Sequence, residues 1–220
     1  MNAVTPARTL LFDLDGTLTD NYAGIAASIR HALARLAAPE PTDAELRACV
    51  GPPLRGSFAR LLATGDDAVV EQAVAHYRER FSDVGWKENV PYPGVAEALA
   101  ALADDGTPMF LCTAKPETFA RRIVEHFGFA PHFRGIYGAD FAGRFDDKAT
   151  LMAHLLATER VAPSGAVMIG DRHHDITAAR ANGTGAVGVL WGYGSREELA
   201  GADALLETPE RLADLRSARG

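Results

Sequence analysis

The sequence predicts an α/β fold, with a doubly wound parallel sheet that is interrupted by an all-helical insertion. From residue 91 onward, short apolar segments alternate with helical segments, a pattern typical of a parallel sheet with right-handed crossovers. Residues 21–86 instead carry only helical patterns, and they follow a single apolar strand. We therefore expect a Rossmann-like core domain of residues 1–20 and 87–220 and a helical domain of residues 21–86.

The first strand and the helical insertion follow from apolar spacing. Residues 9–12 form a short, β-prone apolar run, which favours a buried strand. After Asp20 the apolar residues recur at three- and four-residue spacing, which indicates a helix up to about residue 36. Thr42 precedes Glu45 by three residues, as in the capping box of a second helix. Two more helices are expected at residues 55–62 and 67–83.

The second half of the chain repeats a strand followed by a helix. An Ala- and Leu-rich helix is expected to end near residue 104, before the first of these strands. The expected strands are residues 107–112, 135–138, 166–169 and 186–190. The expected helices between them are residues 116–127, 147–158 and 175–181.

Composition excludes several classes of protein. The chain has 220 residues, 47% of them hydrophobic, and a net charge of −7 without a basic run, which argues against binding nucleic acid or anionic lipid. No apolar stretch approaches the ~20 residues that span a membrane, and the first six residues lack the features of a signal peptide. Cys49 and Cys112 are too far apart to indicate a disulfide framework or a zinc site. We expect a cytoplasmic protein.

Two aspartates stand at the end of the first predicted strand. Asp13 and Asp15 lie two residues apart, so an extended backbone turns both side chains to the same side, and Gly16 permits a sharp exit from the strand. Two carboxylates that face one point repel each other unless a cation or a shared proton compensates. A hard divalent cation is the natural compensation. The pair therefore favours a metal site over a strand end capped by acidic turn residues.

Further polar residues are expected at the same edge, because ligands bind beyond the carboxyl ends of parallel strands. Thr113 follows the 107–112 strand, and with Ala114 it would offer a hydroxyl and free backbone N–H groups at a helix N-terminus, which suits a phosphate. Lys148 opens a later helix. It is one of only three lysines among 22 basic residues, the others being Lys87 and Lys115. In a chain that otherwise uses arginine, each lysine is a candidate for a role that needs a compact point charge.

A second acidic pair follows the strand at residues 166–169. Asp171 ends that strand and Asp175 lies four residues later, so the two can share one face if a helix begins there and complete an oxygen-rich magnesium site. His173 and His174 lie between them and would suit a softer metal. Adjacent histidines point in different directions, however, and the surrounding ligands are hard oxygens. Magnesium is therefore the expected ion.

These motifs carry a family resemblance. The Asp-Leu-Asp-Gly-Thr run at residues 13–17 and the Gly-Asp-Arg-His-His-Asp run at residues 170–175 resemble the first and fourth motifs of the haloacid dehalogenase superfamily, whose members are mostly magnesium-dependent phosphohydrolases. Thr113 is similar to the second motif. Lys148 is similar to the third, although many relatives have Lys-Pro where this chain has Lys-Ala. The segment at residues 170–176, followed by the Gly-Tyr-Gly-Ser run at residues 192–195, is similar to members named phosphoglycolate phosphatases or 5′-nucleotidase-like phosphatases.

The resemblance implies a mechanism with a covalent intermediate. Asp13 would be the nucleophile that forms an aspartyl-phosphate, and Asp15 would protonate the leaving oxygen and then activate the hydrolytic water. Magnesium would be held by Asp13, the backbone carbonyl of Asp15 and Asp171, with Asp175 as a ligand or a support. The expected activity is hydrolysis of a small phosphorylated metabolite, with phosphoglycolate or a nucleoside 5′-monophosphate as the best candidates.

The resemblance also assigns phosphate binding and specificity. Thr113, the Ala114 amide and Lys148 would bind the phosphoryl oxygens. The helical insertion would be a cap that excludes water and carries part of the specificity, with Arg55 and Arg172 as candidates for binding a substrate anion. The protein is expected to be a monomer or a homodimer.

Other activities of the same superfamily would need partly different residues. A sugar phosphomutase would share every core motif and differ in what the cap admits. A regulatory or binding module could keep the fold, but an Asn at position 13 or 15 would be expected there, and both are Asp. Dehalogenation has no use for Asp15 and the acidic metal set, and a phosphonatase needs a lysine in the first cap helix, which has none.

Overall fold

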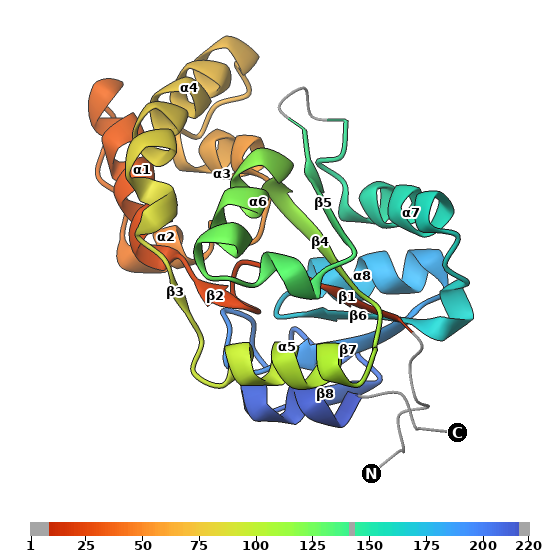
Figure 1. The fold of residues 1–220 in the computed structure, drawn as a ribbon. Coiled ribbons are helices and arrows are strands. Elements are labelled where there is room, and N and C mark those ends of the chain that lie inside the picture. The colour runs from red at the N-terminus through yellow and green to blue at the C-terminus, as the bar shows by residue number, and fades with distance from the viewer. Residues whose placement is uncertain (1–8, 141–143, 216–220) are drawn as a thin grey trace. The chain divides into compact units, whose positions relative to one another are not determined.

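The computed structural model describes residues 9–140 and 144–215, and the chain divides into two compact units (Figure 1). One unit combines Met1–Thr19 with Pro91–Gly220, and the other is Asp20–Val90. The first six residues, on which the expectation about a signal peptide rests, lie outside the described residues. Among the described helices, none is long and apolar enough to cross a membrane.

The first unit is built on a six-stranded sheet in the order β5-β4-β1-β6-β7-β8. Every paired neighbour in it runs parallel, which confirms the predicted parallel α/β fold. The strands are β1 (Thr9–Phe12), β4 (Met109–Pro116), β5 (Gly135–Ala139), β6 (Ala166–Gly170), β7 (Gly185–Val189) and β8 (Ala204–Leu206). Phe12 at the end of β1 lies opposite Leu111 of β4 and Ile169 of β6. This register places the residues that follow the three strands at one edge of the sheet.

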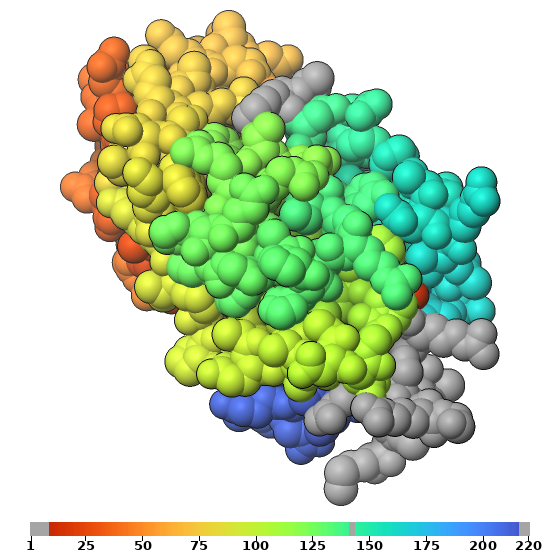
Figure 2. Space-filling model, in the orientation of Figure 1, coloured from red at the N-terminus to blue at the C-terminus, as the bar shows by residue number. Residues whose placement is uncertain are grey.

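Helices cover both faces of this sheet. They are α5 (Val95–Asp104), α6 (Glu117–His126), α7 (Lys148–Glu159) and α8 (His173–Asn182). Figure 1 shows α5 on one side of the sheet and α7 and α8 on the other, and Figure 2 shows α5 and α6, in yellow-green and green, covering one face of this unit. Leu11, Cys112 and Met168 from the three central strands pack with Leu155 of α7 and Ile176 of α8 in one buried cluster. The alternation of side chains along each strand thus divides the core between the two faces.

The second unit, Asp20–Val90, is helical as its periodicity predicts. Its helices are α1 (Tyr22–Arg35), α2 (Asp43–Arg47), α3 (Leu54–Leu61) and α4 (Asp67–Asp83). The apolar stripe of α4 is buried along its length, and its members are Val70, Ala73, Val74, Tyr77 and Phe81. At the start of α2 the Glu45 amide donates to the Thr42 hydroxyl and the Thr42 amide donates to the Glu45 carboxylate, which is the predicted capping box.

Two predicted boundaries near the sheet edge are wrong. β4 continues through Pro116, and α6 begins only at Glu117, because the strand keeps pairing with β5 across a register shift between Thr113 and Pro116. The helix after β6 begins at His173 instead of Asp175. The short features that were not predicted include β8 and the two-stranded sheet of β2 (Thr19–Asp20) and β3 (Val90–Pro91).

Cys112 is fully buried in β4, and this burial raises the pKa of its thiol to about 12. Because the thiolate is the reactive form, we expect an alkylating reagent at pH 8 to label Cys112 about 10³-fold more slowly in the native chain than after unfolding. A Cys49→Ala variant leaves Cys112 as the only thiol, so mass spectrometry of labelled protein gives its rate directly. Equal rates before and after unfolding would contradict the buried placement.

Candidate active site

The ends of β1, β4 and β6 bring the candidate residues together. Asp13 follows β1 directly, and its amide donates to the Ile169 carbonyl of β6 at 2.9 Å. Asp171 follows β6, and Thr113 lies near the end of β4. Because β1 lies between the other two strands, the predicted convergence of separate chain segments on one sheet edge is what the fold produces.

Asp13 is buried and bonded through both carboxylate oxygens. The Leu14 amide donates to Oδ1 at 2.8 Å, and Lys148 Nζ lies 2.9 Å from Oδ2. Lys148 also forms an ion pair with Asp175 Oδ1. The lysine, which is the first residue of α7, therefore bridges the carboxylates that follow β1 and open α8. Burial lowers the Lys148 pKa, but the charges of Asp13 and Asp175 outweigh it, so the net shift is upward and the side chain stays cationic.

Asp171 is fully enclosed, as is Asp175. The Asp171 side chain has no exposed surface, and Oδ2 accepts a hydrogen bond from the Tyr193 amide at 2.8 Å while Oδ1 accepts a long one of 3.4 Å from the Thr17 hydroxyl. Burial is the main cause that raises its pKa well above the ordinary value, followed by the charges of Asp175 and Asp13. The acid is thus held in a setting that disfavours its own negative charge.

Two glycines let the backbone approach these acids closely. Gly16 has φ +84°, and a Cβ there would lie 2.2 Å from Asp171 Oδ2. Gly170 ends β6, and a Cβ there would lie 2.1 Å from Asp175 Cγ. Real Cβ atoms do not come this close, so a side chain at either position would displace an acid of the site. The glycines of both acidic motifs therefore have a packing role as well as a conformational one.

The carboxylates of Asp13, Asp171 and Asp175 fit a metal ion. Each offers an oxygen, and these oxygens lie within 4.8 Å of one another in a buried cluster. Burial also raises the pKa of Asp175 to about 6, although Lys148 opposes the shift. With Asp15 included, the four carboxylates of the site exceed its two lysines by two negative charges, which one divalent cation would balance. Hard carboxylate oxygens are the ligands that Mg²⁺ prefers.

Asp15 pairs with Lys115, which the sequence indicates only as a candidate point charge. Lys115 Nζ lies 2.7 Å from Asp15 Oδ2, and both side chains are buried. Asp15 Oδ1 is also buried, and it has no hydrogen-bond partner among the described residues. The signal in the sequence was the scarcity of lysine, since Lys115 and Lys148 are two of three lysines and both lie in this site. Lys87, the third, is exposed in the other unit, beside the ring of Trp86.

Thr113 and Ala114 lie at the sheet edge, but not at a helix N-terminus. Both belong to β4, and α6 begins after them, at Glu117. The Thr113 hydroxyl accepts a hydrogen bond from the Lys115 amide at 3.3 Å. Any backbone amide that they offer to a phosphate is therefore presented by an irregular strand end and not by the first turn of a helix.

The two arginines suggested for substrate binding both have acidic partners. Arg172 Nε donates to Glu198 Oε1 at 2.8 Å, and His173 contacts the same oxygen. Despite partial burial, these bonds lower the Glu198 pKa to about 2. Arg55 lies in α3 of the other unit and is ion-paired with Glu71 of α4. His174 lies against His173, and neither belongs to the metal-type cluster found among the described residues.

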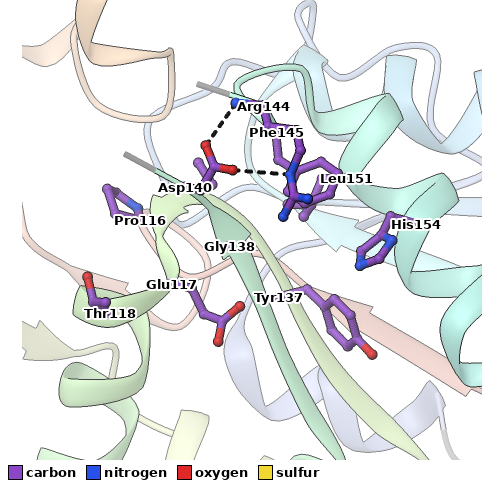
Figure 3. A pocket seen from close by; sticks show the side chains of 11 residues that line it. Pro116, Glu117, Thr118, Tyr137, Gly138, Asp140, Arg144, Phe145, Leu151 and His154 are labelled. Carbon is purple, nitrogen blue, oxygen red and sulfur yellow. Dashed lines mark hydrogen bonds and ion pairs between the residues drawn. The ribbon is translucent and has the colours of Figure 1, made fainter. Parts of the chain in front are cut away.

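A separate cavity of about 290 Å³ lies where β5 ends and α6 begins (Figure 3). Of the described residues that line it, none is a predicted site residue. Phe145 forms one wall, between the Arg144 guanidinium at 4.4 Å and the His154 ring at 4.9 Å. Arg144 is also paired with Asp140. The cavity is therefore distinct in its lining from the carboxylate cluster.

The chain is similar in sequence to proteins with assigned activities. A 5′-nucleotidase of Pseudomonas aeruginosa is 45% identical over 190 residues, which cover 86% of each chain. The tyrosine-protein kinase PtkA of Mycobacterium tuberculosis is 40% identical over 96% of this chain and 72% of its own length. A phosphoglycolate phosphatase of Pseudomonas putida is 32% identical over 86% of this chain and 71% of its own length.

The fold is also similar to that of a solved phosphatase structure. The crystal structure of a predicted phosphatase from Clostridium acetobutylicum superposes with a TM-score of 0.91 at 33% identity and covers 96% of this chain and 98% of its own. The sequence pattern of the haloacid dehalogenase-like hydrolases matches residues 10–189, from the first strand to the end of β7. Together with the relatives that share most of their length with it, this match confirms the predicted resemblance: the chain belongs to the haloacid dehalogenase-like hydrolase family.

Proposed function

We propose that the chain is a magnesium-dependent phosphomonoester hydrolase that acts through an aspartyl-phosphate on Asp13. The observation that carries the proposal is the buried cluster of Asp13, Asp171 and Asp175, bridged by Lys148. Two acids of a metal-type site, Asp13 and Asp175, are thereby paired with a fixed cation, and a further acid, Asp15, lies two residues after Asp13. The family and the relatives named as phosphatases support the same reaction class.

Asp13 would attack the phosphorus atom. Its Oδ1 is held by the Leu14 amide and its Oδ2 by Lys148, so the carboxylate is oriented before substrate binds. An attacking carboxylate and a phosphate ester are both anions, and a positive charge beside them reduces their repulsion. Bond formation to Asp13 splits a difficult displacement into two easier ones.

Asp15 would act as the acid and then the base. In the first step it protonates the oxygen that leaves with the substrate's organic group. In the second it removes a proton from the water that hydrolyses the aspartyl-phosphate. The unpartnered Oδ1 of Asp15 is the atom available for both transfers.

Thr113, the Ala114 amide and Lys148 would bind the phosphoryl oxygens. Asp13, the backbone carbonyl of Asp15 and Asp171 would hold Mg²⁺, with Asp175 as a ligand or as the support that orients Lys148. The bound ion would neutralise negative charge on the phosphoryl group during transfer. Lys148 would supply a fixed positive charge beside the nucleophile.

The proposed substrate is a small phosphorylated metabolite, either phosphoglycolate or a nucleoside 5′-monophosphate. Relatives that carry these two activity names are 32% and 45% identical to the chain. We further propose that the helical unit is a cap that carries part of the specificity, with Arg55 and Arg172 as weaker candidates for a substrate anion because each already has an acidic partner. A cytoplasmic monomer or homodimer remains the expectation from the sequence.

Protein phosphorylation is a second candidate, because a relative named tyrosine-protein kinase matches 96% of the chain. A protein kinase would transfer a phosphoryl group to a tyrosine hydroxyl instead of water. A sugar phosphomutase would transfer the phosphoryl group to a second hydroxyl of a sugar phosphate. On this proposal, both activities would share a phosphorylated Asp13 with the hydrolase and would differ in the acceptor. The acceptor is therefore what an assay must identify.

We expect the purified chain to hydrolyse p-nitrophenyl phosphate with Mg²⁺ and to lose this activity in excess EDTA. Released phosphate should then be measured with phosphoglycolate, nucleoside 5′-monophosphates and sugar phosphates. Phosphate release that exceeds sugar-phosphate isomerisation supports the hydrolase over the mutase. Incubation with ATP and a tyrosine peptide provides the kinase test. Turnover that is unchanged by EDTA would contradict the magnesium dependence.

A further inference from the structure

We propose that Lys115 is a positioning residue for Asp15, which fixes the oxygen through which this acid exchanges protons with the leaving group and water. The inference rests on the proposed function, in which Asp15 is the acid and base. It adds a residue outside the motif positions that the sequence identified. Its basis is the 2.7 Å contact between Lys115 Nζ and Asp15 Oδ2, in which 4% of the lysine and 10% of the aspartate side chain are exposed.

The contact assigns different tasks to the two oxygens of Asp15. A lysine ammonium group only donates hydrogen bonds, so Oδ2 is committed to accepting one from Lys115. A proton carried by Asp15 must therefore sit on Oδ1. Oδ1 is buried and has no hydrogen-bond partner among the described residues, which leaves it free for the leaving oxygen and later for water.

The backbone around Lys115 is arranged to hold this contact. The Lys115 amide donates to the Thr113 hydroxyl at 3.3 Å, and the pairing of β4 with β5 shifts register between Thr113 and Pro116. The next residue, Pro116, has a fixed φ. A flexible lysine side chain thus starts from a constrained backbone, and β4 is the direct neighbour of the strand that leads to Asp15.

The two lysines of the site have separate partners. Lys148 contacts Asp13 and Asp175, whereas Lys115 forms an ion pair with Asp15. Lys148 therefore supports the nucleophile and Lys115 the acid and base. This division predicts that loss of Lys115 impairs the proton transfers without weakening the binding of the phosphoryl group.

The experiment compares Lys115→Met with the wild type on two substrates. p-Nitrophenolate leaves as a stable anion and needs little help from an acid, whereas an alkyl phosphate such as phosphoglycolate needs its leaving oxygen protonated. We expect kcat/KM for phosphoglycolate, or for the best alkyl phosphate of the panel, to fall by about 10²-fold. We expect kcat/KM for p-nitrophenyl phosphate to fall less than about 10-fold in the same preparation, because kcat/KM covers the steps up to departure of the leaving group and not the later hydrolysis of the aspartyl-phosphate. Inhibition by inorganic phosphate should remain near the wild-type value.

Three variants complete the test. Lys115→Arg keeps a cation and should restore part of the alkyl-phosphate activity. Lys87→Met removes the exposed lysine of the other unit and should leave both activities unchanged. In an Asp15→Asn background, Lys115→Met should cause no further loss, because the residue that it positions has lost its function.

The possible outcomes separate this inference from the proposed function. Equal losses of kcat/KM on both substrates, or an added loss in the Asp15→Asn background, would overturn the positioning role. A large rise in KM and in the phosphate inhibition constant would instead place Lys115 on the phosphoryl group. A wild-type chain that hydrolyses neither substrate with Mg²⁺ would overturn the proposed function, and with it the role of Asp15 on which the inference depends.

Discussion

Asp13→Asn is expected to lower kcat for p-nitrophenyl phosphate by about 10⁴-fold or more, because it removes the atom that forms the covalent bond to phosphorus. Asparagine has nearly the same shape and can still accept the hydrogen bond that the Leu14 amide donates to Asp13. The variant also removes one of the three acids in the buried cluster. Its fold should therefore persist while its chemistry is lost.

The same variant tests the intermediate directly. Wild-type protein that is mixed with substrate and quenched in acid should gain the mass of one phosphoryl group, on the peptide that contains residue 13. Asp13→Asn should gain none. Asp104→Asn is a suitable control, because Asp104 is an exposed acid at the end of α5 in the same unit. Undiminished turnover in Asp13→Asn, with Asp104→Asn also unchanged, would contradict the aspartyl-phosphate mechanism.

The sequence alone was sufficient to predict the positions of helices and strands whose apolar pattern is long or whose ends carry capping or turn residues. β1 at Thr9–Phe12 and α4 at Asp67–Asp83 lie where the pattern predicts them, since a full apolar run or stripe must be buried. The acids Asp13, Asp171 and Asp175 could also be brought together in advance, because parallel strands present their carboxyl ends at one edge. These predictions need only local pattern and topology.

Features set by contacts between distant segments could not be predicted in this way. The Asp15–Lys115 pair depends on the register shift that extends β4 past Thr113, and no local pattern reveals that shift. The partner of Arg172 is Glu198, 26 residues later along the chain, so the sequence alone suggested a substrate anion for Arg172 and did not reveal this pair. β8 has only three residues and pairs at the sheet edge, where a short segment carries too little pattern to be recognised.

Asp171→Asn is expected to have opposite effects on activity and on the stability of the metal-free chain. Activity with Mg²⁺ should fall by about 10³-fold, because the variant loses a proposed ligand of the ion that would offset charge on the phosphoryl group. In EDTA, however, the variant should unfold at a higher denaturant concentration than the wild type. Asp171 has no exposed surface and its pKa is raised by burial and by the charges of Asp175 and Asp13, so a neutral side chain there removes a repulsion.

The raised pKa values of the buried acids predict how the stability of the metal-free chain changes with pH. Asp171 and Asp175 both have raised pKa values, that of Asp175 moving from 3.8 to about 6, so at these two sites the folded chain binds more protons than the unfolded chain. Their contribution to the free energy of unfolding in EDTA should therefore decrease as pH rises from 3.8 to about 6, against the increase contributed by acids with lowered pKa values such as Glu198. The decrease should be smaller in Asp171→Asn. Affinity for Mg²⁺ should increase over the same interval, because the ion competes with protons for the carboxylates.

Denaturant unfolding at pH 7.5 with and without Mg²⁺ measures the metal's contribution directly. At about 100 times its dissociation constant, an ion that binds only the folded chain stabilises it by about 2.7 kcal/mol. We expect this increment in the wild type and in Asp104→Asn and its loss in Asp171→Asn.

If Asp171→Asn kept the full increment, Asp171 would not be a ligand. If it were also less stable than the wild type in EDTA, the repulsion inferred from the buried acids would be wrong. A lost increment together with higher stability in EDTA is the result expected if the spacing of the buried carboxylates serves the metal-bound state at the cost of stability without the metal.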